Sequence, residues 1–200
     1  KITPPHAGRG LAAPRRSGHG DGKPNVGGQS RRPLALERSR ACDRVHGGFR
    51  VDALKTECRA RTRAVDGEGA RLSGGRWNSP GQRAVYLSST LSLAAMETFV
   101  HLGDDAARLE YVYFDVEIPT SVTILSLARK PKGWRNEPPT AASMRVGDRW
   151  LQDGNSVLLE APSAIIPSET NLILNPLHPD ASKLRIGTAR VFQFDPRMWK

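Results

Sequence analysis

The sequence predicts an α+β fold with a mostly β core, and three observations lead to this class. Segments with the alternation and the β-branched or aromatic content of strands outnumber segments with helical periodicity. Two segments carry the start and stop signals of helices. The first 50 residues are rich in Gly, Pro, Arg and Ser and show neither the alternation of a strand nor the periodicity of a helix. We therefore expect a mixed sheet with flanking helices behind an unstructured front.

The front of the chain is basic and poor in apolar residues. Residues 1–60 contain 13 Lys and Arg against 5 Asp and Glu, whereas residues 61–200 contain 17 against 15. So few apolar side chains cannot offset the entropy lost on ordering. We expect residues 1–55 to form a disordered basic extension and residues 56–200 to form one folded domain. Such an extension attracts nucleic acid or other acidic surfaces without sequence specificity.

Two helices and several strands are predicted behind this front. Thr90 or Ser89 is expected to cap a helix over 90–102 that ends at Gly103. A second helix is expected over 140–154 and also ends at a glycine. The segments with strand character are 84–88, 109–118, 121–127, 156–163, 170–175 and 189–195.

Composition excludes several classes of protein. No segment approaches the roughly 18 consecutive apolar residues that a membrane span needs. Cys42 and Cys58 are too few for a disulfide scaffold or a cysteine-based zinc site, and no spacing of His, Asp and Glu indicates a metal. The chain starts at Lys1 without an apolar leader. We expect a cytoplasmic protein that uses neither a membrane nor a metal.

The stretch GEGARLSGGRWNSPG, residues 67–81, is the first candidate for a binding site. Its glycines allow either a tight hairpin or the close approach of a ligand to the backbone. In the second case Arg76 supplies the charge that holds an anion. The stretch matches neither the phosphate loop that ends in Lys-Ser/Thr nor a dinucleotide fingerprint between strand and helix.

Three further side chains are candidates, each with a structural alternative. Glu97 shares a helix face with apolar neighbours such as Leu93, so it either lines a cleft or lies half-exposed on the helix. Tyr86 points to the opposite side of its strand from the residues beside it, and either contacts a ligand or fills the core. Ser163 lies at the end of a predicted strand and either caps a turn or contacts a ligand. His178, in the stretch NPLHPD, is expected to be structural.

These motifs together resemble the RES domain family, the toxins of bacterial RES–Xre toxin–antitoxin pairs. The resemblance runs from about Arg59 to Phe194 and is strongest in GGRWNSPG and PSAIIPSETNLILNPLHP. Arg76, Glu97 and Ser163 fall on the arginine, glutamate and serine for which the family is named. Tyr86 falls on the tyrosine that follows the GGRWN motif.

The resemblance implies an ADP-ribosyltransferase-like fold and an enzyme that consumes NAD⁺ as its substrate, by hydrolysis, phosphorolysis or transfer of ADP-ribose to a protein. Arg76 is then expected to bind the pyrophosphate and Tyr86 to stack against the nicotinamide. Glu97 stabilises the oxocarbenium-like ribose. Ser163 hydrogen-bonds the ribose or the nicotinamide amide. The implied partner is an Xre-like helix-turn-helix antitoxin that blocks the active-site cleft.

The front of the chain departs from the family pattern. Residues 51–57, VDALKTE, are mostly polar where family members carry an apolar strand, so one edge of the sheet is expected to be missing. A degenerate, inactive toxin that still occupies its antitoxin is therefore one alternative. The other is a non-enzymatic protein that binds nucleic acid through its arginine-rich front, although that front lacks interleaved aromatic residues.

Overall fold

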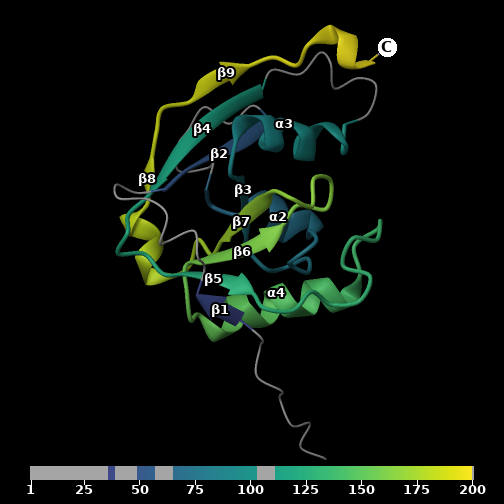
Figure 1. Cartoon of the computed structure of the whole chain (residues 1–200). Coiled ribbons are helices and arrows are strands. Elements are labelled where there is room, and N and C mark those ends of the chain that lie inside the picture. Colours follow the sequence, from purple (N-terminus) through teal and green to yellow (C-terminus); the bar gives the residue numbers. More distant parts are fainter. Residues whose placement is uncertain (1–35, 39–48, 57–64, 103–110, 200) are drawn as a thin grey trace, which may run out of the picture. The chain divides into compact units, whose positions relative to one another are not determined.

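A single sheet organises the folded part of the chain in this computed structural model (Figure 1). The structure describes residues 36–38, 49–56, 65–102 and 111–199, which all lie in the unit that begins at Pro33. Within these residues the sheet has nine strands in the order β1-β5-β6-β7-β3-β2-β4-β8, and β9 pairs with β4 as well. Neighbouring strands are antiparallel except for the parallel pair β5 and β6. The predicted α+β class is confirmed.

The strands are β1 Leu36–Arg38, β2 Phe49–Thr56, β3 Val85–Ser88, β4 Tyr111–Ile118, β5 Ile124–Leu127, β6 Leu158–Pro162, β7 Thr170–Leu174, β8 Arg185–Ile186 and β9 Arg190–Phe192. The helices are α2 Glu68–Ser73, α3 Leu91–Phe99 and α4 Ala141–Asp153, with 3₁₀ turns η3 Pro179–Lys183 and η4 Pro196–Trp199. Each strand predicted from the sequence has a counterpart, while β1, β2, β8 and α2 were not predicted. None of the described helices is long and apolar enough to span a membrane.

The predicted caps set the ends of α3 and α4. The side chain of Thr90 accepts a hydrogen bond from the backbone N–H of Leu93, at 3.1 Å, and starts α3. Gly154 ends α4 with a positive φ of 59°. Helix α3 is shorter than the predicted 90–102. The backbone N–H groups of His101 and Leu102 donate to carbonyls three residues back, and not four as in an α-helix.

Strand β2 corrects the prediction of a missing sheet edge. It lies inside the sheet between β3 and β4, and its register with β4 runs from Phe49 opposite Ile118 to Thr56 opposite Tyr111. Strand pairing uses backbone groups, so a polar stretch such as 51–57 can form a strand where its neighbours supply the partners. Apolar content was therefore the wrong criterion for this strand.

The predicted boundary between extension and domain also differs from the structure. Strand β1 and all of β2 except Thr56 lie within residues 1–55, which were expected to be disordered, and both strands pair with strands of the domain. The basic residues of 1–35, Gly103 and both cysteines lie outside the described residues. For the rest of the first 55 residues the predicted disorder stays a prediction.

The two faces of the central strands are buried in different ways. Val85, Leu87 and their cross-strand neighbours on β7 point into the larger core cluster. The opposite face carries Tyr86 and Ile173, and it packs against Trp150 of α4 and the loop around Trp77. The predicted alternation of Tyr86 with its neighbours is confirmed, and this second face is the one that carries the candidate site.

Candidate active site

The carboxylate of Glu97 is held at one of its two oxygens. Ser163 donates its hydroxyl proton to Oε1 at 2.6 Å, and the side-chain amide of Asn171 donates to the same oxygen at 2.6 Å. Helix α3 supplies the glutamate, the end of β6 supplies the serine and β7 supplies the asparagine. Among the described residues no donor binds Oε2. The structure therefore brings Glu97 and Ser163 together, and within its described part the second carboxylate oxygen has no hydrogen-bond donor.

Ser163 uses all of its hydrogen-bonding capacity inside the protein. Its oxygen accepts from the backbone N–H groups of Ile165 and Ile166, at 3.1 and 2.9 Å, while its single proton goes to Glu97. A hydroxyl has one donor and two acceptor sites, so all three are occupied. The side chain is also fully buried. Ser163 thus caps a turn, which is one of the two alternatives raised for it, and it also orients the carboxylate of Glu97.

Arg76 anchors the polar loop that follows β5. Its Nη1 donates to the carbonyls of Trp134 and Asn136 at 2.7 and 2.8 Å, and its Nη2 pairs with Glu137 at 3.1 Å. The ring of Trp134 stacks on Trp77, with centroids 6.2 Å apart. Only 16% of the arginine side chain is exposed, against 66% for the glutamate. An anion that reaches Arg76 would displace an exposed carboxylate rather than a buried one.

Tyr86 holds the glycine-rich loop against the sheet through two hydrogen bonds. Its hydroxyl accepts from the backbone N–H of Trp77 at 2.9 Å and donates to Oδ1 of Asn78 at 2.8 Å. A Cβ placed on Gly75 would lie 2.5 Å from this hydroxyl, so the close approach requires glycine at that position. Burial raises the pKa of Tyr86 well above its ordinary value, while the bond from Trp77 and the charge of Arg76 oppose that shift.

The hydroxyl of Tyr86 is expected to contribute to stability. In Tyr86→Phe the buried N–H of Trp77 loses its partner, which costs about 1–3 kcal/mol of unfolding free energy. Urea denaturation measures the loss. Tyr113→Phe is the matched control, because the ring of Tyr113 lies under the guanidinium of Arg190 and no described group hydrogen-bonds its hydroxyl. Equal stability of the Tyr86 variant and the wild type would contradict this role.

One sheet face connects the arginine loop with the glutamate. Tyr86 and Ser88 lie two residues apart on β3 and share a face, so their Cα atoms are about 7 Å apart. The hydroxyl of Ser88 donates to Oδ1 of Asn171 at 2.8 Å, and Asn171 donates in turn to Glu97. Strand β3 therefore links the two parts of the candidate site, because Tyr86 holds the loop of Arg76 and Ser88 bonds the asparagine that contacts Glu97.

Sequence reasoning missed the two polar residues in the middle of this series. Asn171 is a polar residue on the site-bearing face of β7, whose other face carries Leu172 and Leu174, and Ser88 shares a face with Tyr86. That pattern was visible in the sequence. The pairing of Ser88 opposite Asn171 was not, because antiparallel register depends on the fold.

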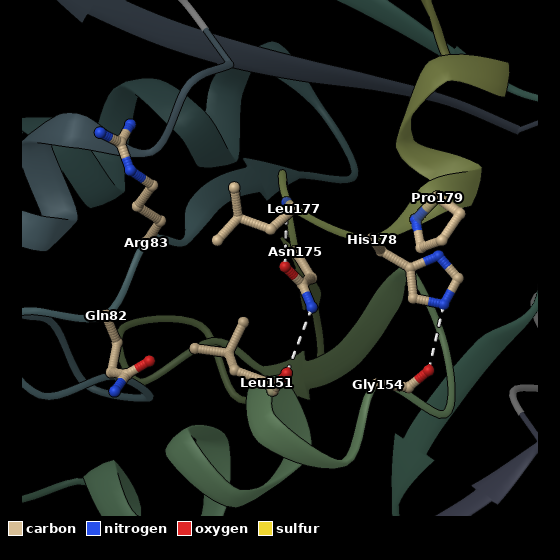
Figure 2. Close-up of a pocket in the computed structure, with 8 residues that line it drawn as sticks. All are labelled: Gln82, Arg83, Leu151, Gly154, Asn175, Leu177, His178 and Pro179. Atoms are coloured by element: carbon tan, nitrogen blue, oxygen red, sulfur yellow. Dashed lines mark hydrogen bonds between the residues drawn. The ribbon is translucent and has the colours of Figure 1, made fainter.

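A cavity of about 220 Å³ lies away from these residues, between the end of α4 and the start of η3 (Figure 2). Nδ1 of His178 accepts from the N–H of Asp180, and Nε2 lies 3.1 Å from the carbonyl of Gly154. Asn175 likewise bonds Leu151 and Leu177. The predicted structural role of His178 is confirmed. In the described part of the chain, no three His, Cys, Asp or Glu side chains are grouped as metal ligands.

The fold is similar to that of the solved MbcT–MbcA toxin–antitoxin complex of M. tuberculosis. The TM-score is 0.60 at 16% identity, and the similarity covers 76% of this chain and 87% of that chain. The fold is thus of the class found in that toxin–antitoxin complex. The sequence matches the model of the RES domain over residues 49–195. The chain belongs to the RES domain family.

Relatives at the sequence level are toxins by name. The chain is 39% identical over 146 residues to the "Prs ADP-ribosylating toxin" of Sphingobium sp. (strain YBL2), covering 70% of this chain and 91% of the relative. It is 40% identical over 134 residues to "Toxin Res" of Yersinia enterocolitica, covering 66% of this chain and 88% of the relative. The family match begins at residue 49, the first residue of β2, which supports β2 as part of the domain.

Proposed function

We propose that this protein is the toxin of a toxin–antitoxin pair and that it cleaves the nicotinamide–ribose bond of NAD⁺. The resemblance to a toxin named for ADP-ribosylation supports the substrate. The observation that carries the chemistry is the carboxylate of Glu97, which is oriented through Oε1 and whose Oε2 accepts no hydrogen bond from a described residue. A carboxylate held in this way is suited to stabilise positive charge that develops on a neighbouring ribose.

In the proposed reaction the bond between the ribose C1′ and the nicotinamide nitrogen breaks. The electron pair goes to the nitrogen, so neutral nicotinamide leaves and C1′ becomes oxocarbenium-like. Oε2 of Glu97 stabilises that charge. The oxygen of an acceptor, which is water, phosphate or a protein side chain, then bonds to C1′ and loses its proton.

The other predicted residues take roles around Glu97. Arg76 binds the pyrophosphate as a permanently charged fork, and its loop is held against the sheet by Tyr86. Tyr86 is half-buried, and its ring stacks against the nicotinamide. Ser163 acts as a positioning residue, because its only proton is already donated to Glu97.

Glu137 is expected to compete with the pyrophosphate for Arg76. In Glu137→Gln the carboxylate that pairs with Nη2 is removed, so the KM for NAD⁺ should fall by about 2- to 5-fold, the range of an exposed ion pair. Glu117→Gln is the matched control, since Glu117 pairs with Arg185 on the far side of β4. An unchanged or higher KM in the Glu137 variant would argue against phosphate binding at Arg76.

We also propose that the partner is an antitoxin of the Xre-like helix-turn-helix type that covers this site. The similarity to a toxin solved with its antitoxin supports a protein partner, and the resemblance to RES–Xre pairs supports its type. Such a partner should inhibit nicotinamide release when it is added in equimolar amount.

The proposal is tested by incubating the purified full chain with NAD⁺ and following nicotinamide release. Three arms contain water alone, added phosphate, or a cell extract with NAD⁺ radiolabelled in the adenylate. Free ADP-ribose identifies water as the acceptor, ADP-ribose 1″-phosphate identifies phosphate, and labelled protein identifies transfer. Absence of nicotinamide release in every arm would refute the function.

A further inference from the structure

We propose that Asn171 is a positioning residue for the reaction, and that it and Ser163 together fix the carboxylate of Glu97. This inference rests on the proposed function and assigns a role to a residue outside the arginine, glutamate and serine that the family resemblance supplies. It predicts that Asn171 affects the rate of the chemical step without contacting the substrate.

The two donors constrain Glu97 from different strands. Ser163 at the end of β6 and Asn171 on β7 both lie 2.6 Å from Oε1. A glutamate side chain held by a single hydrogen bond still rotates about that contact. A second donor from another direction removes this rotation and fixes where Oε2 points. Both distances are within or below the range of charge-assisted hydrogen bonds.

Ser88 fixes the orientation of the Asn171 amide. An ionised carboxylate only accepts, so the NH₂ group of the amide must face Glu97 and its oxygen must face away. On that side the Ser88 hydroxyl donates to Oδ1 at 2.8 Å. A flipped amide would place two oxygens 2.6 Å apart at Glu97. Ser88 is buried, so its hydroxyl needs this partner and holds the amide in the productive orientation.

The position of Asn171 on the sheet is not explained by packing. Its neighbours Leu172 and Leu174 point into the core on the other face, and Ile173 fills the core further along the same face. The backbone of Asn171 pairs with both Ala161 and Ser88, and this pairing does not depend on the side chain. The amide is used for two hydrogen bonds, one that it donates to Glu97 and one that it accepts from Ser88.

The first test is steady-state kinetics of Asn171→Leu, which keeps the approximate volume and removes the donor. We expect kcat for NAD⁺ cleavage to fall about 10- to 100-fold, the range for a hydrogen bond to a charged group, with KM changed less than threefold. Asn171→Ala serves if the leucine variant does not fold. Ile173→Val on the same strand is the control for a small loss of packing and should retain the wild-type kcat. A kcat within twofold of wild type in the Asn171 variant overturns the proposal.

A double-mutant cycle tests whether Ser88 acts through Asn171. Ser88→Ala alone should lower kcat by about 2- to 5-fold, because the amide loses its orienting partner. In the Asn171→Leu background the same substitution should have no further effect on kcat. Additive losses would mean that Ser88 acts by another route and would overturn this part of the proposal.

A measurement without turnover separates this inference from the proposed function. In ¹⁵N NMR of the full chain, one side-chain amide proton of Asn171 should be shifted far downfield by the carboxylate and should move upfield in Glu97→Gln. If wild-type protein cleaves no NAD⁺ but shows this signal, the function fails while the contact stands. If the signal is unaffected by Glu97→Gln, the positioning role fails whatever the activity.

Discussion

Glu97→Gln is expected to lower kcat for NAD⁺ cleavage by at least about 100-fold, the scale of losing one preorganised electrostatic group. Glutamine has the same shape, and its side-chain oxygen can still accept from Ser163 and Asn171. The substitution therefore removes the negative charge and little else. Nicotinamide release under saturating NAD⁺ measures the effect.

The fold of this variant should be unaffected. Its melting temperature is expected to stay within a few degrees of wild type, because both hydrogen bonds to Oε1 are retained. Glu117→Gln, an exposed carboxylate on β4, provides the matched control and should keep full activity. A Glu97→Gln protein that is folded and cleaves NAD⁺ at the wild-type rate would exclude the carboxylate mechanism.

Gly147→Ala is expected to cause the largest loss of stability. Gly147 lies on the side of α4 that faces the glycine-rich loop, and a Cβ there would lie 1.6 Å from the carbonyl oxygen of Trp77. The backbone of Gly147 fixes the position of the Cβ, and the oxygen belongs to the backbone of Trp77, so neither atom can rotate away from the other. The loop is also tied to α4 by Ser79, whose N–H and hydroxyl donate to Asp148 at 2.8 and 2.6 Å.

The expected cost of Gly147→Ala is about 3 kcal/mol or more, at the upper end of overpacking effects. For a chain of this size that corresponds to a fall in Tm of roughly 6–12 °C. Gly69→Ala is the control, because a Cβ on Gly69 of α2 meets no atom within 4 Å and alanine favours a helix. Thermal denaturation of both variants tests the contact, and equal Tm values would rule it out.

Local signals in the sequence were sufficient for most of the elements. Thr90 and Gly154 could be recognised as helix caps from the sequence. A side-chain oxygen at the start of a helix, or a left-handed residue at its end, satisfies the unpaired backbone groups there whatever surrounds the helix. The alternation at 84–88 placed Tyr86 opposite Val85, and the structure agrees. Strand β2 was missed because its pairing with β4 depends on backbone groups that a hydropathy pattern does not report.

The candidate site was predictable as a set of residue types but not as an arrangement. Arg76, Glu97 and Ser163 were singled out for their chemistry and through the family resemblance. The groups that bond to these residues were not predicted. The loop at 134–137, which hydrogen-bonds Arg76, and the asparagine that orients Glu97 are both distant from them in the sequence. Contacts between such distant segments follow from sheet register and loop packing.

The sequence by itself determined the α+β class, the start of α3 at Thr90, the end of α4 at Gly154, the side of β3 on which Tyr86 lies and the residue types of the candidate site. Each of these depends on interactions within a few residues along the chain. Only the tertiary structure decided that Ser163 donates to Glu97, that Asn171 donates to the same oxygen, and that β2 lies inside the sheet. Those facts depend on which strands become neighbours, and strand order is set by the packing of the whole domain.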